Sequence, residues 1–166
     1  IDGKLPNLAL MRLGSYYKKN GHNVDFTRSV HRDLFDKEYD FVFASSIFKF
    51  SINRINTLKK NYPNAIIGGT GTDDWKLVVE DYIGDYENLD YSFYPNYNFS
   101  LGFTQRGCRL KCKFCVVPIK EGKNKSVNTI YEIWRGGSYP RKIHLLDNDF
   151  FGQPEEQWQA RIKEIQ

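Results

Sequence analysis

The chain has 166 residues, of which 40% are hydrophobic and 16% aromatic, and it carries a net charge of +4. This composition is typical of a folded protein and excludes a disordered tail, a collagen-like fibre and a low-complexity segment. No apolar run reaches the roughly 20 residues that a membrane helix needs, and no signal peptide opens the chain. We therefore expect a cytoplasmic protein. The chain opens at Ile1 without an initiator Met, and we expect it to be a fragment.

Helix-like and strand-like patterns alternate through the first 85 residues. Apolar residues at helical spacing predict helices, and aromatic or β-branched runs predict short buried strands. The predicted helices are 5–20, 52–62 and 75–83, with a helical turn at 33–38, and the predicted strands are 24–26, 40–46 and 65–69. This alternation is typical of an α/β domain with a parallel sheet, whose ligands bind at the carboxyl ends of the strands. We assign this domain to residues 1–85.

The remaining chain divides into an aromatic segment and a second α/β unit. Residues 86–98 are rich in Tyr and Phe without helical period, which predicts an ordered linker. Residues 99–166 form the second unit: a strand at 101–104, a cysteine loop, a helix capped by Ser126, a strand at 142–146 and a helix from Pro154. Because a two-stranded parallel sheet cannot cover its own faces, we expect this unit to be truncated.

Positive charge is concentrated in one segment, residues 105–125. Seven Lys and Arg residues lie there against Glu121 alone, so the segment is more positive than the whole chain. Such a patch suits nucleic acid, a phosphorylated substrate or an anionic cofactor.

All three cysteines lie in the same basic segment, at Cys108, Cys112 and Cys115. An odd number of cysteines at such close spacing does not predict a disulfide framework, and clustered thiols in a reducing compartment usually bind metal or react. Three thiolates at C-x3-C-x2-C spacing can hold three irons of a four-iron cluster, leaving the fourth iron open to a small molecule. The neighbouring cations favour the thiolate forms.

Two other metal interpretations use the same cysteines. A zinc site with three cysteines would need a fourth ligand, and His144 is the only histidine after Cys115. His144 lies in the middle of a predicted strand, where we expect it to face the sheet. An electron-transfer iron–sulfur protein would need a fourth cysteine, which the sequence lacks.

The Cys108-x3-Cys112-x2-Cys115 motif, with Phe114 before its last cysteine, resembles the signature of the radical SAM superfamily. The first 85 residues resemble the cobalamin-binding domain that precedes the barrel in one subgroup of that family. The resemblance implies a doubly wound, flavodoxin-like sheet followed by the start of a (β/α) partial TIM barrel. It also implies that the three cysteines ligate a [4Fe–4S] cluster, which cleaves S-adenosylmethionine (SAM) to a 5′-deoxyadenosyl radical that abstracts a substrate hydrogen.

Further cofactor contacts follow from the same resemblance. Phe114 would lie beside the adenine of SAM. Where the family often has Gly-Gly-Glu, this chain has 146–150, and Asp147 or Asp149 would accept from the SAM amine or ribose. An external donor of flavodoxin or ferredoxin type would supply the electron.

Cobalamin itself is not expected to bind. The family's binding motif is Asp-x-His-x-x-Gly, and the corresponding loop has Asp2 but Lys4 and Asn7 in place of the histidine and glycine. A protonated lysine cannot ligate cobalt. The alternative function, of a different class, is a nucleic-acid-binding module stabilised by zinc or an iron–sulfur cluster, with residues 105–125 on the phosphates.

Overall fold

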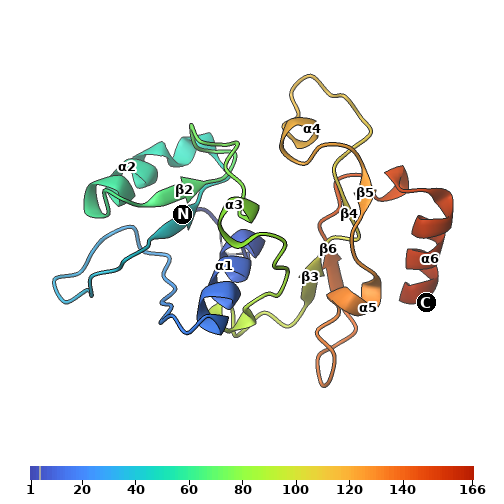
Figure 1. The fold of residues 1–166 in the computed structure, drawn as a ribbon, viewed down its shortest axis with the longest axis horizontal. Helices are drawn as coiled ribbons and strands as arrows, with labels where there is room; N and C mark the ends of the chain where they lie inside the picture. The colour runs from blue at the N-terminus through green and yellow to red at the C-terminus, as the bar shows by residue number, and fades with distance from the viewer. Residues whose placement is uncertain (4) are drawn as a thin grey trace. The chain divides into compact units, whose positions relative to one another are not determined.

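The computed structural model of the protein describes residues 1–3 and 5–166, and these divide into two units, Ile1–Pro95 and Asn96–Gln166. The boundary lies inside the segment 86–98 that the sequence identifies as a linker. Both units combine helices with small parallel strand pairs, so the chain is a mixed α/β protein (Figure 1). Among the described residues, no helix has both the length and the apolar character required to cross a membrane.

The described residues of the first unit form one parallel strand pair and three α-helices. Strands β1 and β2 pair in parallel, with Ala44 opposite Ile67. The elements in chain order are α1 (Leu8–Lys19), β1 (Phe43–Ser45), η1 (Lys49–Ser51), α2 (Ile52–Asn61), β2 (Ile66–Gly68), α3 (Glu80–Ile83) and η2 (Tyr91–Phe93). Helix α2 packs against the strands through a buried cluster of Val30, Ile55, Leu58 and Ile67.

Helix α1 shows how local sequence sets an element's limits. The side chain of Asn7 accepts a hydrogen bond from the Leu10 N–H, which satisfies a free donor of the first turn. Lys18 and Lys19 lie in the last turn, where positive charge favours the helix dipole. Gly21 follows with a φ of +83°, as the sequence predicts for the residue after the helix.

Two predictions for the first unit are wrong. Residues 24–26 form no strand, because Phe26 stacks on Phe93 with ring centroids 4.8 Å apart and has no strand partner. The helix predicted at 75–83 is confined to α3, because the chain before Glu80 forms turns. The Asp81 carboxylate accepts from the Val78 N–H at 3.5 Å, a local bond that competes with helical pairing.

The second unit contains a parallel pair and an antiparallel pair. Strands β3 and β6 pair in parallel, with Leu101 opposite His144, while β4 and β5 are antiparallel. The elements in chain order are β3 (Ser100–Gly102), β4 (Gln105–Arg106), α4 (Val117–Lys120), β5 (Lys125–Ser126), α5 (Ile130–Ile133), β6 (Ile143–Leu145), η3 (Phe150–Gly152) and α6 (Glu155–Ile165). Ile130 and Ile133 of α5 are buried, and Ile133 lies against β3, where a Cβ atom on Gly102 would be 2.8 Å from it.

The cap of helix α5 differs from the one predicted. Ser126 belongs to β5, and Thr129 caps the helix instead. The Thr129 hydroxyl accepts from the Glu132 N–H, and the Glu132 carboxylate accepts from the Thr129 N–H at 2.7 Å. This reciprocal arrangement is a capping box, which the sequence Thr-x-x-Glu encodes.

Candidate functional site: the cysteine loop

The three cysteines lie in the loop that connects β4 to β5. These two short strands pair in antiparallel fashion, with Arg106 opposite Lys125, and so close the base of the loop. All three thiols are free; Cys108 and Cys115 are half-buried and Cys112 is exposed. The Cys115 N–H donates to the Cys112 carbonyl at 3.0 Å, which turns the chain between them. The loop therefore carries three free thiols on a base fixed by backbone pairing.

The sulfur atoms of the cysteine loop do not converge. In the part of the chain that the structure describes, no three His, Cys, Asp or Glu side chains form a group that could hold a metal ion. The side chain of Phe114 is 92% exposed. Cluster binding would therefore require the exposed stretch around Cys112 and Phe114 to close toward Cys108.

Gly107, immediately before the first cysteine, is fixed from three sides. Its N–H donates to the Glu121 carboxylate at 3.0 Å, and its carbonyl accepts from the Gln105 side-chain amide at 2.7 Å. Its φ is +78°, and a Cβ atom there would lie 2.3 Å from the Lys123 carbonyl oxygen. Only glycine meets both demands without strain, since a side chain disfavours positive φ. The loop start is thus held in one conformation.

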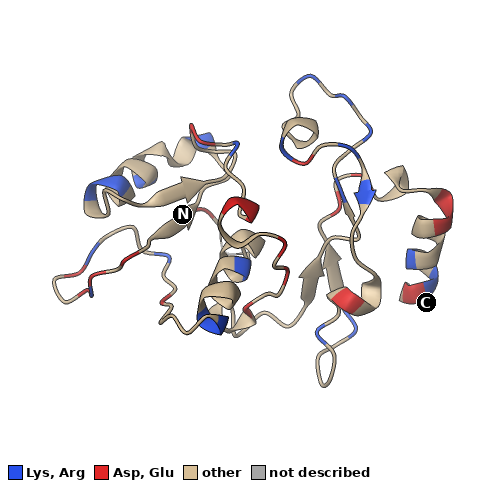
Figure 2. Cartoon of the chain, viewed as in Figure 1, with Lys and Arg blue, Asp and Glu red and all other residues tan. Residues whose placement is uncertain are grey.

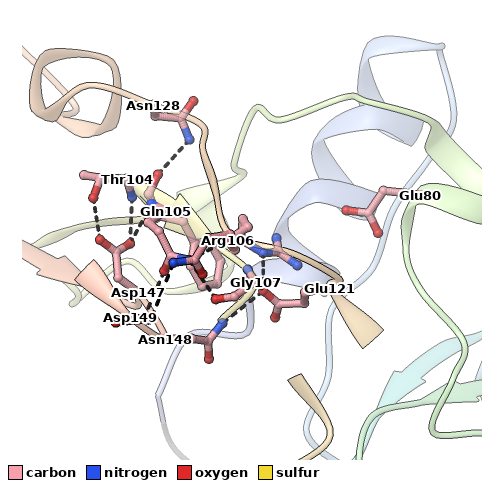
Figure 3. Close-up of polar contacts among 12 residues, drawn as sticks. Glu80, Thr104, Gln105, Arg106, Gly107, Glu121, Asn128, Asp147, Asn148 and Asp149 are labelled. Atoms are coloured by element: carbon pink, nitrogen blue, oxygen red, sulfur yellow. Dashed lines mark hydrogen bonds and ion pairs between the residues drawn. The ribbon is translucent and has the colours of Figure 1, made fainter. Parts of the chain in front are cut away.

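Gln105 links the cysteine loop to the segment after β6, and the sequence analysis assigned it no role. Its side chain is fully buried, at 0% exposure. Besides Gly107, the amide donates to the Asn124 side chain at 2.8 Å, and its oxygen accepts from the Asp149 N–H at 3.0 Å (Figure 3). Because both the nitrogen and the oxygen of this buried amide form hydrogen bonds, Gln105 orders the segments that it joins.

Glu121 joins the far end of the loop to its start. One carboxylate oxygen accepts from Arg106 Nε at 2.9 Å, from Gly107 and from the Asn148 amide at 2.9 Å. Burial raises the pKa of Glu121, but the bonds from Gly107, Arg106 and Asn148 lower it by more, so the pKa lies below its ordinary value. Glu121 therefore stabilises the fold in its charged form.

This charge makes stability depend on pH in a defined direction. Because the pKa of Glu121 is depressed by folding, its contribution is complete above the ordinary glutamate pKa of about 4.3 and is lost as pH falls through the folded pKa. We expect Glu121→Gln to lower the free energy of unfolding by about 1–3 kcal/mol at pH 7 and by progressively less below about pH 4.3. Urea unfolding from pH 7 to pH 3 measures the difference.

The matched control for this pH series is Glu156→Gln, which neutralises an exposed carboxylate in the first turn of α6. We expect this variant to stay within about 0.5 kcal/mol of the parent protein throughout the series. A stability loss for Glu121→Gln that stays constant from pH 7 to pH 3 would contradict the conclusion that Glu121 stabilises the fold in its charged form.

Asp147 and Asp149, predicted to contact SAM, lie at the carboxyl end of β6 and already have protein partners. Asp147 accepts from the Thr104 N–H at 2.7 Å, from the Thr104 hydroxyl and from the Gln105 N–H at 3.1 Å (Figure 3). Asp149 accepts from the Arg109 N–H at 3.2 Å and lies 3.9 Å from the Cys108 sulfur. The structure thus brings Asp149 to the cysteine loop, while Asp147 ties β6 to the end of β3.

His144 lies in β6, as predicted, and its side chain is exposed. Its Nδ1 is 2.6 Å from the Tyr97 hydroxyl, and its ring stacks on Phe99 at 4.5 Å. These contacts engage the ring with aromatic neighbours, and the described residues include no metal-binding group to which it belongs.

The loop expected to replace a cobalamin-binding motif lies in the first unit. The Asp2 carboxylate accepts from the Phe48 N–H at 3.0 Å, the Ile47 N–H and the hydroxyls of Ser46 and Ser51. Lys4 lies outside the described residues. Behind this loop, a Cβ atom on Gly69 would lie 2.1 Å from the Ser46 carbonyl oxygen, so the two strand ends pack backbone against backbone. Asp2 therefore serves to order the chain after β1.

Thiolate sulfur is the donor that iron–sulfur clusters use, and the cysteine loop supplies three such sulfurs, which do not converge in the described part of the chain. Three free thiols lie within one short loop, and several Lys and Arg residues lie along the same loop (Figure 2). The exposed position of Cys112 leaves its sulfur unconstrained by packing. No protein-family model, curated protein or solved structure matches this chain. Any assignment of function therefore depends on the residues of the loop themselves.

Proposed function

We propose that the chain is part of a radical SAM enzyme in which Cys108, Cys112 and Cys115 ligate a [4Fe–4S] cluster. The observation that carries the proposal is the position of three free thiols on a loop next to a parallel strand pair. The Asp147 contact with Thr104 joins the ends of β3 and β6, and the cysteine loop begins just beyond that contact. The carboxyl edge of parallel strands is where α/β proteins bind their ligands.

The parallel pairing of β3 with β6 supports the finer fold that we propose for the second unit. The two strands are adjacent in the sheet, and helix α5 lies between them in sequence and packs on β3. Such a β-α-β element is the repeating unit of a (β/α) barrel. We propose that residues 99–166 begin a partial barrel, and that the first unit is a doubly wound domain of cobalamin-binding type that does not bind cobalamin.

The bound cluster would supply the electron that cleaves SAM to methionine and a 5′-deoxyadenosyl radical. The chain's own residues would position the reactants. Gly107, held by Gln105 and Glu121, fixes the start of the cysteine loop. Asp149 would present its carboxylate beside Cys108, where the SAM amine would lie. Phe114 would cover the adenine once the loop closes. We place the protein in the cytoplasm, where a flavodoxin or ferredoxin would donate the electron.

The test is anaerobic reconstitution of the 166-residue chain with iron and sulfide. The proposal predicts a brown protein with about four irons per chain and, after reduction, an EPR signal that changes when SAM is added. A colourless protein, or a zinc-loaded one, would contradict it. An EPR signal that SAM leaves unchanged would indicate a cluster without the open iron that the proposal requires.

The alternative nucleic-acid module makes a different prediction for the same protein. Binding of single-stranded or duplex DNA or RNA would fall steeply with salt concentration, since Lys and Arg side chains would release counterions. That binding would also survive replacement of all three cysteines. Arg106 and Arg109 are already paired with Glu121 and Asp149, which reduces the charge available for such a role.

A further inference from the structure

A cavity of about 420 Å³ opens beside the first cysteine of the loop. Its walls come from both halves of the loop: Cys108, Arg109 and Lys111 from the outgoing half, and Pro118, Gly122, Lys123 and Asn124 from the returning half. This volume is within the range of about 300–1,000 Å³ that small-molecule sites occupy. Cys108 is therefore part of the cavity wall.

The charge of the cavity lining is entirely positive. Arg109, Lys111 and Lys123 line it, and no Asp or Glu does. The Arg109 guanidinium is held in place, because Nη1 donates to the Phe151 carbonyl at 3.1 Å and Nε lies 3.3 Å from Asp149. The side chain of Asn124 adds a neutral polar group. A guanidinium fixed in this way can present its remaining N–H groups to an anion at little entropic cost.

We propose that this cavity binds the phosphate group of a small-molecule substrate. A phosphate monoester carries a charge of about −1.5 to −2 at pH 7, which matches a lining with three cations better than a single carboxylate does. Among its lining residues there is no aromatic side chain on which a nucleobase could stack, which argues against single-stranded nucleic acid as the ligand. The role as substrate rests on the proposed function, whereas phosphate binding itself does not require the cluster.

The cations have a competing explanation, because a cluster held by three thiolates is negative and nearby Lys and Arg would offset that charge. The two explanations differ in which lysines they require. Lys111 and Lys123 line the cavity, whereas Lys113 and Lys125 are exposed residues of the same basic segment that do not line it. Only a phosphate site predicts that replacing Lys111 and Lys123 weakens anion binding more than replacing Lys113 and Lys125.

The experiment measures inorganic pyrophosphate binding to the cluster-free chain by isothermal titration calorimetry. We expect the Lys111→Gln/Lys123→Gln double variant to bind at least about tenfold more weakly, since it loses two charge-assisted hydrogen bonds to phosphate oxygens. The Lys113→Gln/Lys125→Gln variant removes the same charge and is expected to bind within about twofold of the parent protein. Circular dichroism of each variant verifies its fold.

Three outcomes would overturn the phosphate site: no binding by the parent chain, equal weakening in both double variants, or tight binding of an oligonucleotide that pyrophosphate does not displace. Iron reconstitution of the same variants separates this result from the proposed function. If pyrophosphate binds and reconstitution with iron and sulfide yields no cluster, the phosphate site stands and the radical SAM proposal is refuted. A cluster that responds to SAM, without pyrophosphate binding, would do the reverse.

Discussion

A protein carrying Cys112→Ser is expected to lose most of its iron after anaerobic reconstitution, to at most about one-tenth of the parent content. Thiolate is the ligand that iron–sulfur clusters require, and a serine hydroxyl stays protonated at neutral pH. Cys112 is the best of the three cysteines for this test because its side chain is exposed, so the substitution removes a ligand without disturbing packing. Iron and sulfide analysis with visible absorbance measures the loss.

The matched control for this cysteine is Lys113→Ser, at the next residue of the same exposed loop. It introduces the same side chain and should retain the parent iron content. The free energies of unfolding of the cluster-free proteins should agree within about 0.5 kcal/mol, as for most exposed substitutions. Full iron content in Cys112→Ser, or the same loss in both variants, would remove Cys112 from the ligand set.

Gly107→Ala is expected to have the largest effect on stability, a loss of about 3 kcal/mol or more in the free energy of unfolding. The left-handed backbone alone costs an alanine about 1–2 kcal/mol. In addition, its Cβ would lie 2.3 Å from the Lys123 carbonyl oxygen, so the backbone of the returning loop half must move. That movement would break the bonds of Gly107 to Gln105 and Glu121. Urea unfolding of the cluster-free chain measures the loss.

Gly122→Ala provides the comparison, because its φ of +76° is nearly the same while no atom lies within 4 Å of the added Cβ. We expect it to lose only the backbone cost of about 1–2 kcal/mol. The difference between the two variants therefore isolates the close approach at Gly107. Equal losses would show that the contact with Lys123 contributes nothing to the stability of the loop.

The sequence predicted the positions of those helices and strands whose ends are set by residues close to them in the chain. Helices α1, α2 and α6 lie where the apolar spacing placed them, because a helix pairs each residue with another four positions away. The β1 and β6 strands also lie inside the runs that predicted them. The cap of α5 is also local, since the sequence Thr129-x-x-Glu132 encodes the capping box, whereas the predicted cap, Ser126, lies in β5.

The sequence also predicted that the three cysteines share one loop, because Cys108, Cys112 and Cys115 are close together in the chain. The backbone around Gly107 is different, because the carbonyl oxygen of Lys123 lies 2.3 Å from where a Cβ atom of residue 107 would be. That contact depends on the returning half of the loop, which no local pattern places.

Tertiary structure alone decided how the loop is held. Gln105 has no helical or strand period to mark it, and its importance comes from Asn124 and Asp149, which lie 19 and 44 residues further along the chain. The partners of Asp147 also depend on tertiary structure. The sequence predicts that its carboxylate is available to a ligand, but in the structure it accepts hydrogen bonds from the N–H groups of Thr104 and Gln105. Composition and spacing fix which groups a loop carries, but a buried polar side chain acquires its partners only when distant segments pack together.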